Sequence, residues 1–122
     1  MLNYQPLIKE EKKYSGLTVK EISPIMKLNL RGKSRDFMSI IGKNINMILP
    51  IEANTSSSTD NYTSMWLSPD EWLVISNNII DEENNNYKIE ELLFNKISKT
   101  NFGAITDVTD QFILINLNGE KV

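Results

Sequence analysis

Four carboxylates beside turns are the side chains best suited to chemistry in this chain: Asp70, Glu71, Asp107 and Asp110. Carboxylates in such positions could exchange protons with a substrate or bind Mg²⁺. Histidine and cysteine are absent from the sequence, which excludes Ser-His-Asp and Cys-His nucleophile systems and the common zinc sites. A carboxylate-only mechanism or a magnesium site is the chemistry that remains open.

Each carboxylate also has a purely structural interpretation. Asp70 and Glu71 belong to a Ser-Pro-Asp-Glu turn, where acidic side chains are favoured by solvation and by local hydrogen bonds. Asp107 and Asp110 flank Thr109, and short polar side chains at such strand junctions often bind backbone amides. The five glycines are too scattered to form a dinucleotide fingerprint or a phosphate loop. We therefore expect no catalytic, cofactor-binding or metal-ligating residue in this chain.

The Ser-Pro-Asp-Glu turn joins two apolar segments that hold both tryptophans. Pro69 presets the first central position of a type I turn, so the segment is predicted to form a β-hairpin. Closure over the turn places Leu67 opposite Trp72. It places Trp66 opposite Leu73, so that the two indoles point to opposite faces of one sheet. We expect one indole in the core and the other either under a loop or against a partner as an interface hot spot.

Alternation of apolar and polar residues predicts a strand upstream of the hairpin, over residues 25–31. Its wet face holds three polar side chains: Lys27, Asn29 and Arg31. Residues 1–24 are polar and mixed, and we expect an extended arm there, before the first regular element. Residues 25–122 are then expected to form a single α+β domain.

Caps and periodicity predict two helices. Ser34 is a typical N-cap and Gly42 a typical stop for the first, and residues 88–99 carry the apolar stripe of the second. Two strand-like segments follow, at residues 104–108 and 112–117. The order strand-helix-strand-strand-helix-strand is the βαββαβ pattern of ferredoxin-like units, in which two helices pack on one face of an antiparallel sheet.

The predicted sheet is apolar on both faces. The strands of the tryptophan hairpin do not alternate cleanly, and Phe112-Ile113-Leu114-Ile115 shows the same lack of alternation. Strands of this kind occur in sheets that are buried on both faces. Because two helices cover only one face, we expect the other face to expose an apolar patch that docks a partner.

Composition narrows the classes of partner and compartment. The net charge of -3 and the isoelectric point near 5.0 argue against nucleic acid or an anionic membrane as the main partner. No apolar run is long enough to span a bilayer, and the N-terminus lacks the basic and apolar regions of a signal peptide. Since there is no cysteine and hence no disulfide framework, we expect a cytoplasmic protein.

Several motifs follow one order along roughly residues 25–120. Trp66–Leu73 reads W-L-S-P-D-E-W-L and resembles the W-L-(G/S)-P-D-E-W-L signature of the gamma subunit of heterotetrameric sarcosine oxidase. The segment I-T-D-V-T-D resembles the family's D-V-S-D element, and Thr109 keeps the hydroxyl of the usual serine. Further matches are an L-x-L-R-G element at residues 28–32, a stretch from Gly42 to Pro50 that resembles G-x-x-L-P with extra residues inserted, and an L-x-G element at residues 117–119.

This resemblance implies a fold related to the folate-binding domain of aminomethyltransferases, and a place in a complex that oxidises the N-methyl group of sarcosine. The gamma subunit of that family is structural; FAD, FMN, NAD and tetrahydrofolate belong to its alpha and beta partners, and zinc to the delta subunit. The residues expected to serve as motif or interface positions are Trp66, Pro69, Asp70, Glu71, Trp72, Asp107 and Asp110. The family continues beyond the position of Val122, so we expect this chain to lack a C-terminal segment.

Three other interpretations stay open. A gamma-like subunit of N-methylglutamate dehydrogenase has a similar subunit plan, and the sequence does not separate the two substrates. A free-standing folate-binding protein of the aminomethyltransferase type would need an acid to bind the pterin, for which Asp107 and Glu71 are the candidates. The third interpretation is a ferredoxin-like interaction module of unrelated function.

Overall fold

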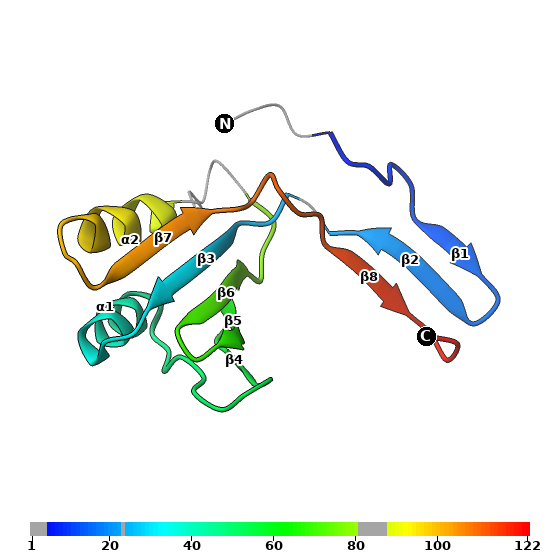
Figure 1. Cartoon of the computed structure of the whole chain (residues 1–122). Helices are drawn as coiled ribbons and strands as arrows, with labels where there is room; N and C mark the ends of the chain where they lie inside the picture. Colours follow the sequence, from blue (N-terminus) through cyan, green and yellow to red (C-terminus); the bar gives the residue numbers. More distant parts are fainter. Residues whose placement is uncertain (1–4, 23, 81–87) are drawn as a thin grey trace.

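The computed structural model describes residues 5–22, 24–80 and 88–122. Within these ranges the chain forms an α+β fold with two antiparallel sheets (Figure 1). The elements are β1 (Lys12–Tyr14), β2 (Leu17–Glu21), β3 (Lys27–Gly32), α1 (Arg35–Ile45), β4 (Ser56–Ser58), β5 (Tyr62–Ser68), β6 (Glu71–Ser76), α2 (Lys88–Ser98), β7 (Gly103–Asp107) and β8 (Ile115–Asn118). None of the helices in these ranges is long and apolar enough to cross a membrane.

The larger sheet has five strands in the order β4-β5-β6-β3-β7. Strands β5, β6, β3 and β7, with the two helices between them in sequence, have the order of a ferredoxin-like βαββαβ unit, and all their pairings are antiparallel. Both helices pack on the same face of this sheet (Figure 1). The predicted α+β class, with two helices on one face of an antiparallel sheet, is confirmed.

Caps fix both ends of α1. The Ser34 Oγ accepts a hydrogen bond from the backbone N–H of Phe37 at 3.0 Å, as expected for an N-cap. The helix ends at Asn46, a left-handed residue with φ 55°, whose backbone N–H donates to the carbonyl of Gly42. The prediction that Gly42 stops the helix is wrong. Asparagine also tolerates the left-handed conformation, and here it supplies the stop one turn later.

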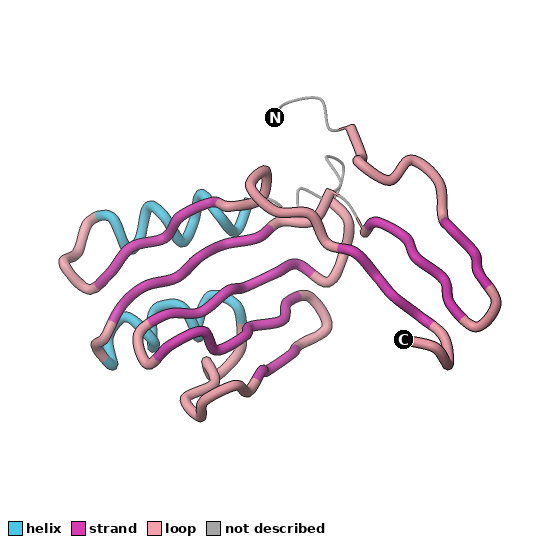
Figure 2. The backbone as a smooth tube through the Cα atoms, turned by 45° about the vertical axis from the view of Figure 1, so that its right-hand side comes forward, coloured by secondary structure: helices cyan, strands magenta, loops and turns pink. Residues whose placement is uncertain are grey.

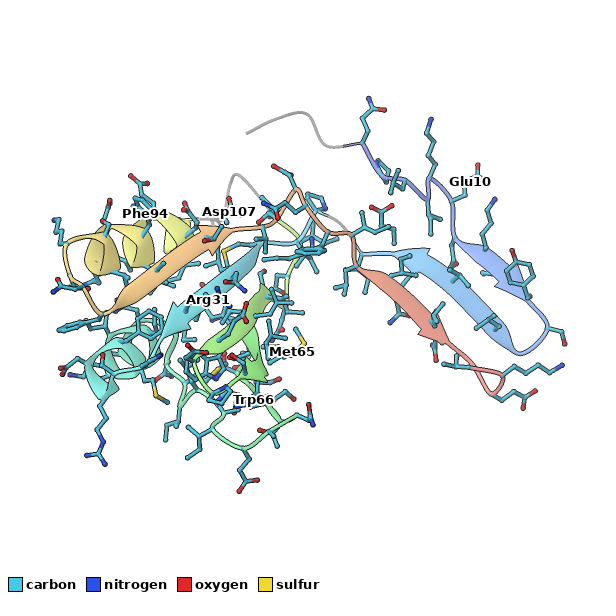
Figure 3. The ribbon with its side chains drawn as sticks, viewed as in Figure 1. Glu10, Arg31, Met65, Trp66, Phe94 and Asp107 are labelled. Carbon is cyan, nitrogen blue, oxygen red and sulfur yellow. The ribbon has the colours of Figure 1, made fainter. Side chains whose placement is uncertain are left out.

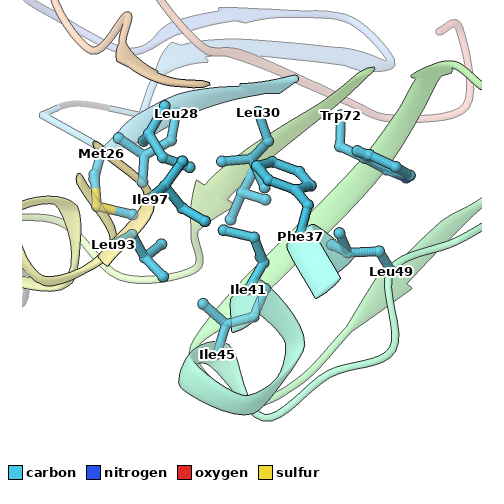
Figure 4. Packing of buried hydrophobic residues seen from close by; sticks show 12 residues of the cluster. Met26, Leu28, Leu30, Phe37, Ile41, Ile45, Leu49, Trp72, Leu93 and Ile97 are labelled. Carbon is cyan, nitrogen blue, oxygen red and sulfur yellow. The ribbon is translucent and has the colours of Figure 1, made fainter. Parts of the chain in front are cut away.

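The core lies between the two helices and one face of the larger sheet (Figure 4). Its buried members are Met26, Leu28, Leu30, Phe37, Ile41, Ile45, Leu49, Trp72, Val74, Leu93, Ile97 and Ile105. The ring of Phe37 stacks on Trp72, with centroids 6.4 Å apart. Gly32 pairs with Gly103 on the neighbouring strand, and a Cβ atom at either position would overlap the Phe37 ring. These two glycines therefore let α1 approach the sheet closely.

A second sheet, with the order β1-β2-β8, stands apart from the larger one (Figure 2). The expectation that no regular element precedes residue 25 is wrong, because β1 and β2 form a hairpin there. β2 then pairs with β8, from the other end of the chain, and β8 begins only at Ile115. Because these two segments lie so far apart in sequence, no local sequence pattern predicts that they pair. The division at residue 24 into an arm and a domain stays a prediction.

The small sheet has one apolar and one polar face. The apolar face carries Tyr14, Leu17, Val19, Ile115 and Leu117, together with Lys12 and Glu21. The polar face carries Lys13, Thr18, Lys20, Asn116 and Asn118. Tyr14 and Leu117 are 63% and 52% exposed. The apolar face is therefore not closed by a second layer as the larger sheet is.

Candidate functional site

The register of the tryptophan hairpin differs from the predicted one. Trp66 lies directly opposite Trp72, and a bulge between Trp66 and Ser68 leaves Leu67 without a partner in the ladder. Residues directly opposite each other share a face, so both indoles point to the helix side of the sheet. The prediction that they point to opposite faces is wrong. The extra residue of the bulge shifts the register of β5 by one residue relative to the predicted hairpin. Trp66 and the β5 residues before it therefore point to the face opposite the predicted one.

The two indoles have different surroundings on that shared face. Trp72 is 1% exposed, and its Nε1–H donates a hydrogen bond of 2.7 Å to the carbonyl of Pro50. Trp66 is only partly buried and packs against the margin of the core (Figure 3). The expectation that one indole lies in the core is confirmed. The role of Trp66 as an anchor for a partner stays a prediction.

Asp70 serves the turn that joins β5 to β6. The Ser68 hydroxyl donates to Asp70 Oδ1 at 2.8 Å, within the turn that contains Pro69. The carbonyl of Asp70 accepts from the backbone N–H of Gly32 at 2.9 Å. These bonds fasten the turn to the end of β3, which agrees with the structural interpretation of this carboxylate.

Glu71 lies on the other face of the larger sheet, the face that the helices leave uncovered (the open face). Its Oε2 accepts a hydrogen bond of 2.8 Å from the Asn29 side-chain amide, and its Oε1 lies 3.4 Å from a guanidinium nitrogen of Arg31. Arg31 is directly opposite Glu71 in the ladder. Because the Arg31 side chain is 65% exposed, water screens this ion pair, and it contributes about 0–1 kcal/mol.

These polar side chains border a hollow of about 430 Å³ on the open face. Its lining comprises Asn29, Arg31, Leu67, Glu71, Leu73, Thr106, Val108, Gln111 and Phe112. A few convergent polar groups on an apolar wall, around a space of this size, are typical of small-molecule sites. Of the residues that the sequence singled out as sites, this hollow holds Glu71. The alternation over residues 25–31 already placed Asn29 and Arg31 on this face, whereas nothing local indicated Gln111 or Phe112.

The open face as a whole is mixed, not apolar. Leu73 and Ile75 lie on it, opposite Met65 and Thr63. The neighbouring part of the face is polar and carries Asn29, Arg31, Glu71 and Thr106. The predicted apolar docking patch is therefore present on only part of this face.

The D-V-T-D motif fastens the end of β7 to the start of β3. Asp107 Oδ1 accepts a hydrogen bond of 3.0 Å from the backbone N–H of Thr109. The buried hydroxyl of Thr109 accepts from the backbone N–H of Lys27 at 3.0 Å, and the carbonyl of Lys27 accepts from Val108 N–H at 2.9 Å. Asp107 thus binds a backbone amide, as its structural interpretation predicted. Asp110 lies exposed beside this junction.

Lys27 is buried at the same junction, although the sequence pattern predicted it on a wet face. Its Nζ donates to the carbonyls of Ile25 and Thr109 at 3.1 and 3.3 Å. Desolvation lowers the pKa of Lys27, against the opposing charges of Asp110, Glu21 and Asp107. The prediction failed because Lys27 is the first residue of β3, where the segment after β7 covers it.

The two acids proposed for pterin binding do not share a site. Asp107 pairs with Leu28, which points into the core, whereas Glu71 pairs with Arg31 on the open face. Among the described residues, no group of three or more Asp or Glu side chains is placed to hold a metal ion. Of the two, only Glu71 borders the hollow described above.

Comparison with known proteins gives a likeness of fold. No protein-family model matches the chain, and no curated protein matches it. A chain in the structure of heterotetrameric sarcosine oxidase from Corynebacterium sp. U-96 in complex with pyrrole 2-carboxylate is similar, with a TM-score of 0.69 and 17% identity. The match covers 84% of this chain and 50% of that chain, so this chain spans about half the length of its structural neighbour.

Proposed function

We propose that this chain is a noncatalytic, gamma-type subunit of a heterotetrameric sarcosine oxidase or of a closely related N-methyl amino-acid oxidoreductase. One observation carries the proposal. The W-L-S-P-D-E-W-L segment, which resembles the gamma-subunit signature, lies in a ferredoxin-like unit whose fold is similar to that of a sarcosine oxidase chain. In this role the chain packs against partner subunits and assists their assembly.

The bonding of both motifs supports a structural role. In the W-L-S-P-D-E-W-L segment, the Trp72 indole donates to the carbonyl of Pro50, and the Asp70 carboxylate accepts from the Ser68 hydroxyl. In the D-V-T-D segment, the Thr109 hydroxyl binds the backbone of Lys27. Side chains committed to such bonds hold a fold together, and they leave few polar groups for chemistry on a substrate.

The proposal assigns the chemistry of the complex to its other chains. FAD, FMN, NAD and tetrahydrofolate would be bound by the alpha and beta subunits, which, with the delta subunit, are the proposed partners in the cytoplasm. The substrate would be sarcosine, with N-methylglutamate as the alternative. Oxidation of each amine by the purified complex distinguishes the two.

Co-purification tests the proposal directly. The tagged chain is co-expressed with the alpha, beta and delta subunits of the same organism, and an unrelated tagged protein of similar size serves as control. We expect flavin absorbance to elute with the tag in a fixed ratio to this chain. Absence of the flavin-bearing subunits from the eluate would refute the assignment.

The hollow on the open face favours one second candidate, a free-standing folate-binding protein. Glu71 and Asn29 present acceptor and amide groups there, beside the apolar side chains of Leu73 and Phe112. Titration calorimetry with tetrahydrofolate tests this function, with Glu71→Gln as the matched variant. An absence of heat with the wild-type chain would remove it.

A further inference from the structure

β8 forms an edge of the small sheet. In the order β1-β2-β8 it has a strand neighbour, β2, on one side only within the described residues. The backbone N–H of Ile22 donates to the carbonyl of Leu114, in the same register that pairs Glu21 with Ile115 and Val19 with Leu117. Hydrogen-bonded and non-hydrogen-bonded pairs alternate along an antiparallel ladder. The N–H and C=O groups of Ile115 and Leu117 therefore point away from β2, toward the free edge.

This edge lacks the features that usually prevent strand pairing. Folded proteins protect exposed edges with lysine, proline or a bulge. Residues 112–118 contain no charged residue and no proline. Ile115 and Leu117 are 44% and 52% exposed. The strand thus offers an apolar, uncharged template to which an extended segment of another polypeptide can add.

The apolar face of the small sheet is continuous with that edge. Ile115 and Leu117 project onto the same face as Tyr14, Leu17 and Val19. A strand added to β8 would therefore present its own alternate side chains beside Ile115 and Leu117. A layer that extends from the added strand across the apolar face would also cover Val19 and Tyr14, so edge and face form one docking surface.

A second copy of this chain is a poor occupant of that surface. In a two-fold antiparallel pairing centred on Asn116, Ile115 of each copy lies opposite Leu117 of the other. Opposed residues share a face, so both apolar faces would lie on the same side of the joined sheet and would stay uncovered. The pairing would be limited to a strand of four residues, whereas a stable interface involves roughly 20–30 residues of each partner.

We propose that β8 receives an extended strand from another subunit of the complex, and that apolar side chains of this subunit cover the apolar face of the small sheet. The inference rests on the proposed function for the identity of the partner. It assigns the docking surface to β8 and Tyr14, Val19 and Leu117, and not to the hollow beside Glu71. The segment opposite β8 is expected to be uncharged and apolar at alternate positions.

Three variants test the edge in the co-expressed complex. In Ile115→Pro the lost N–H points away from β2, so the ladder with β2 is kept while strand addition is blocked. Leu117→Lys places a charge on the apolar face, and Asn116→Gln, the matched control, changes the polar face of the same strand without adding a charge. We expect about tenfold less flavin retained per tagged chain for the first two variants, and no change for the control. Circular dichroism and tryptophan fluorescence check that the larger sheet remains folded.

A second measurement separates the docking surface from the identity of the partner. A synthetic peptide of alternating valine and threonine offers an uncharged extended strand with one apolar face. We expect the peptide to slow amide hydrogen exchange at Ile115 and Leu117 of the wild type by about tenfold at millimolar concentration. In Ile115→Pro we expect no slowing at Leu117. If the wild-type chain retains no flavin-bearing subunits but shows this protection, the proposed function is wrong, whereas the assignment of β8 as a strand-docking edge is supported.

The remaining outcomes overturn the inference. Flavin retention by the wild-type chain that neither Ile115→Pro nor Leu117→Lys reduces would leave the proposed function in place and refute the docking surface. Loss of both flavin retention and peptide protection would refute both proposals. A wild-type dimer in sedimentation that Ile115→Pro converts to a monomer would identify a second copy as the occupant.

Discussion

The five-stranded and three-stranded sheets use the same antiparallel pairing but differ in what covers their apolar faces. In the larger sheet, Leu30 and Val74 are fully buried under α1 and α2. In the smaller sheet, Tyr14 and Leu117 share one apolar face but remain more than half exposed. A sheet becomes a core only when a second layer buries its apolar face. The stability of this chain is therefore expected to reside in the larger sheet, and its capacity for association in the smaller one.

The largest expected effect is loss of the central aromatic side chain of the larger sheet. Trp72→Ala should lower the free energy of unfolding by about 3–5 kcal/mol, because it removes a fully buried indole, the stack on Phe37 and a donor to Pro50. Urea denaturation followed by circular dichroism measures the change. Trp66→Ala is the control, with an expected loss of about 1–2 kcal/mol for a partly buried side chain on the same face. Equal losses would mean that Trp66 belongs to the core as fully as Trp72 does.

The larger sheet was predictable in its elements but not in its register. Helical spacing and the Ser34 cap indicated α1, and the Pro69 turn indicated the hairpin. The bulge at Leu67 was not predictable, because the same turn residues fit a regular hairpin and a bulged one. That single extra residue decided the face of Trp66, and with it the position of the apolar patch.

The smaller sheet was missed because long-range pairing defines it. β2 and β8 lie at opposite ends of the chain, and their short segments give little periodicity to interpret. Burial of Lys27 was missed for a related reason: the segment after Asp107, which covers it, comes from the other end of the βαββαβ unit. The residue types and local turns of the candidate site were therefore predictable from the sequence. The contacts between residues far apart in the chain were not.

The next largest effect is expected where the segment after β7 is fastened to the start of β3. Thr109→Val removes the hydroxyl that accepts from the Lys27 backbone N–H, and leaves this buried donor unpaired, so the free energy of unfolding should fall by about 1–3 kcal/mol. Thr109→Ser keeps the hydroxyl and should lose about 1 kcal/mol or less, the contribution of one buried methyl group. Thermal denaturation compares the two variants. A larger loss for the serine variant would show that the methyl group, not the hydrogen bond, holds the junction.

The buried ammonium of Lys27 gives this junction a pH dependence. Because its pKa in the folded state is lowered from 10.5, the unfolded state binds more protons than the folded state between the lowered value and 10.5. The free energy of unfolding should therefore rise with pH through this window. The rise occurs because the buried ammonium loses its charge, and with it the cost of desolvation. In urea titrations, the difference between the wild type and Lys27→Met should grow in favour of the wild type as pH approaches 10.5. A difference between the wild type and Lys27→Met that stays constant across this pH window would contradict the assignment.

The smallest effect is expected on the apolar face of the small sheet. Leu117→Ala should change the free energy of unfolding by no more than about 0.5 kcal/mol, because half of the side chain already contacts water. The same substitution at Leu30, which is fully buried, should cost about 2–5 kcal/mol in the same denaturation experiment. A loss at Leu117 as large as that at Leu30 would mean that the small sheet unfolds together with the core and that its apolar face is buried in solution. A negligible loss would mean that this leucine adds little to the stability of the isolated chain, which leaves its apolar surface available for a partner.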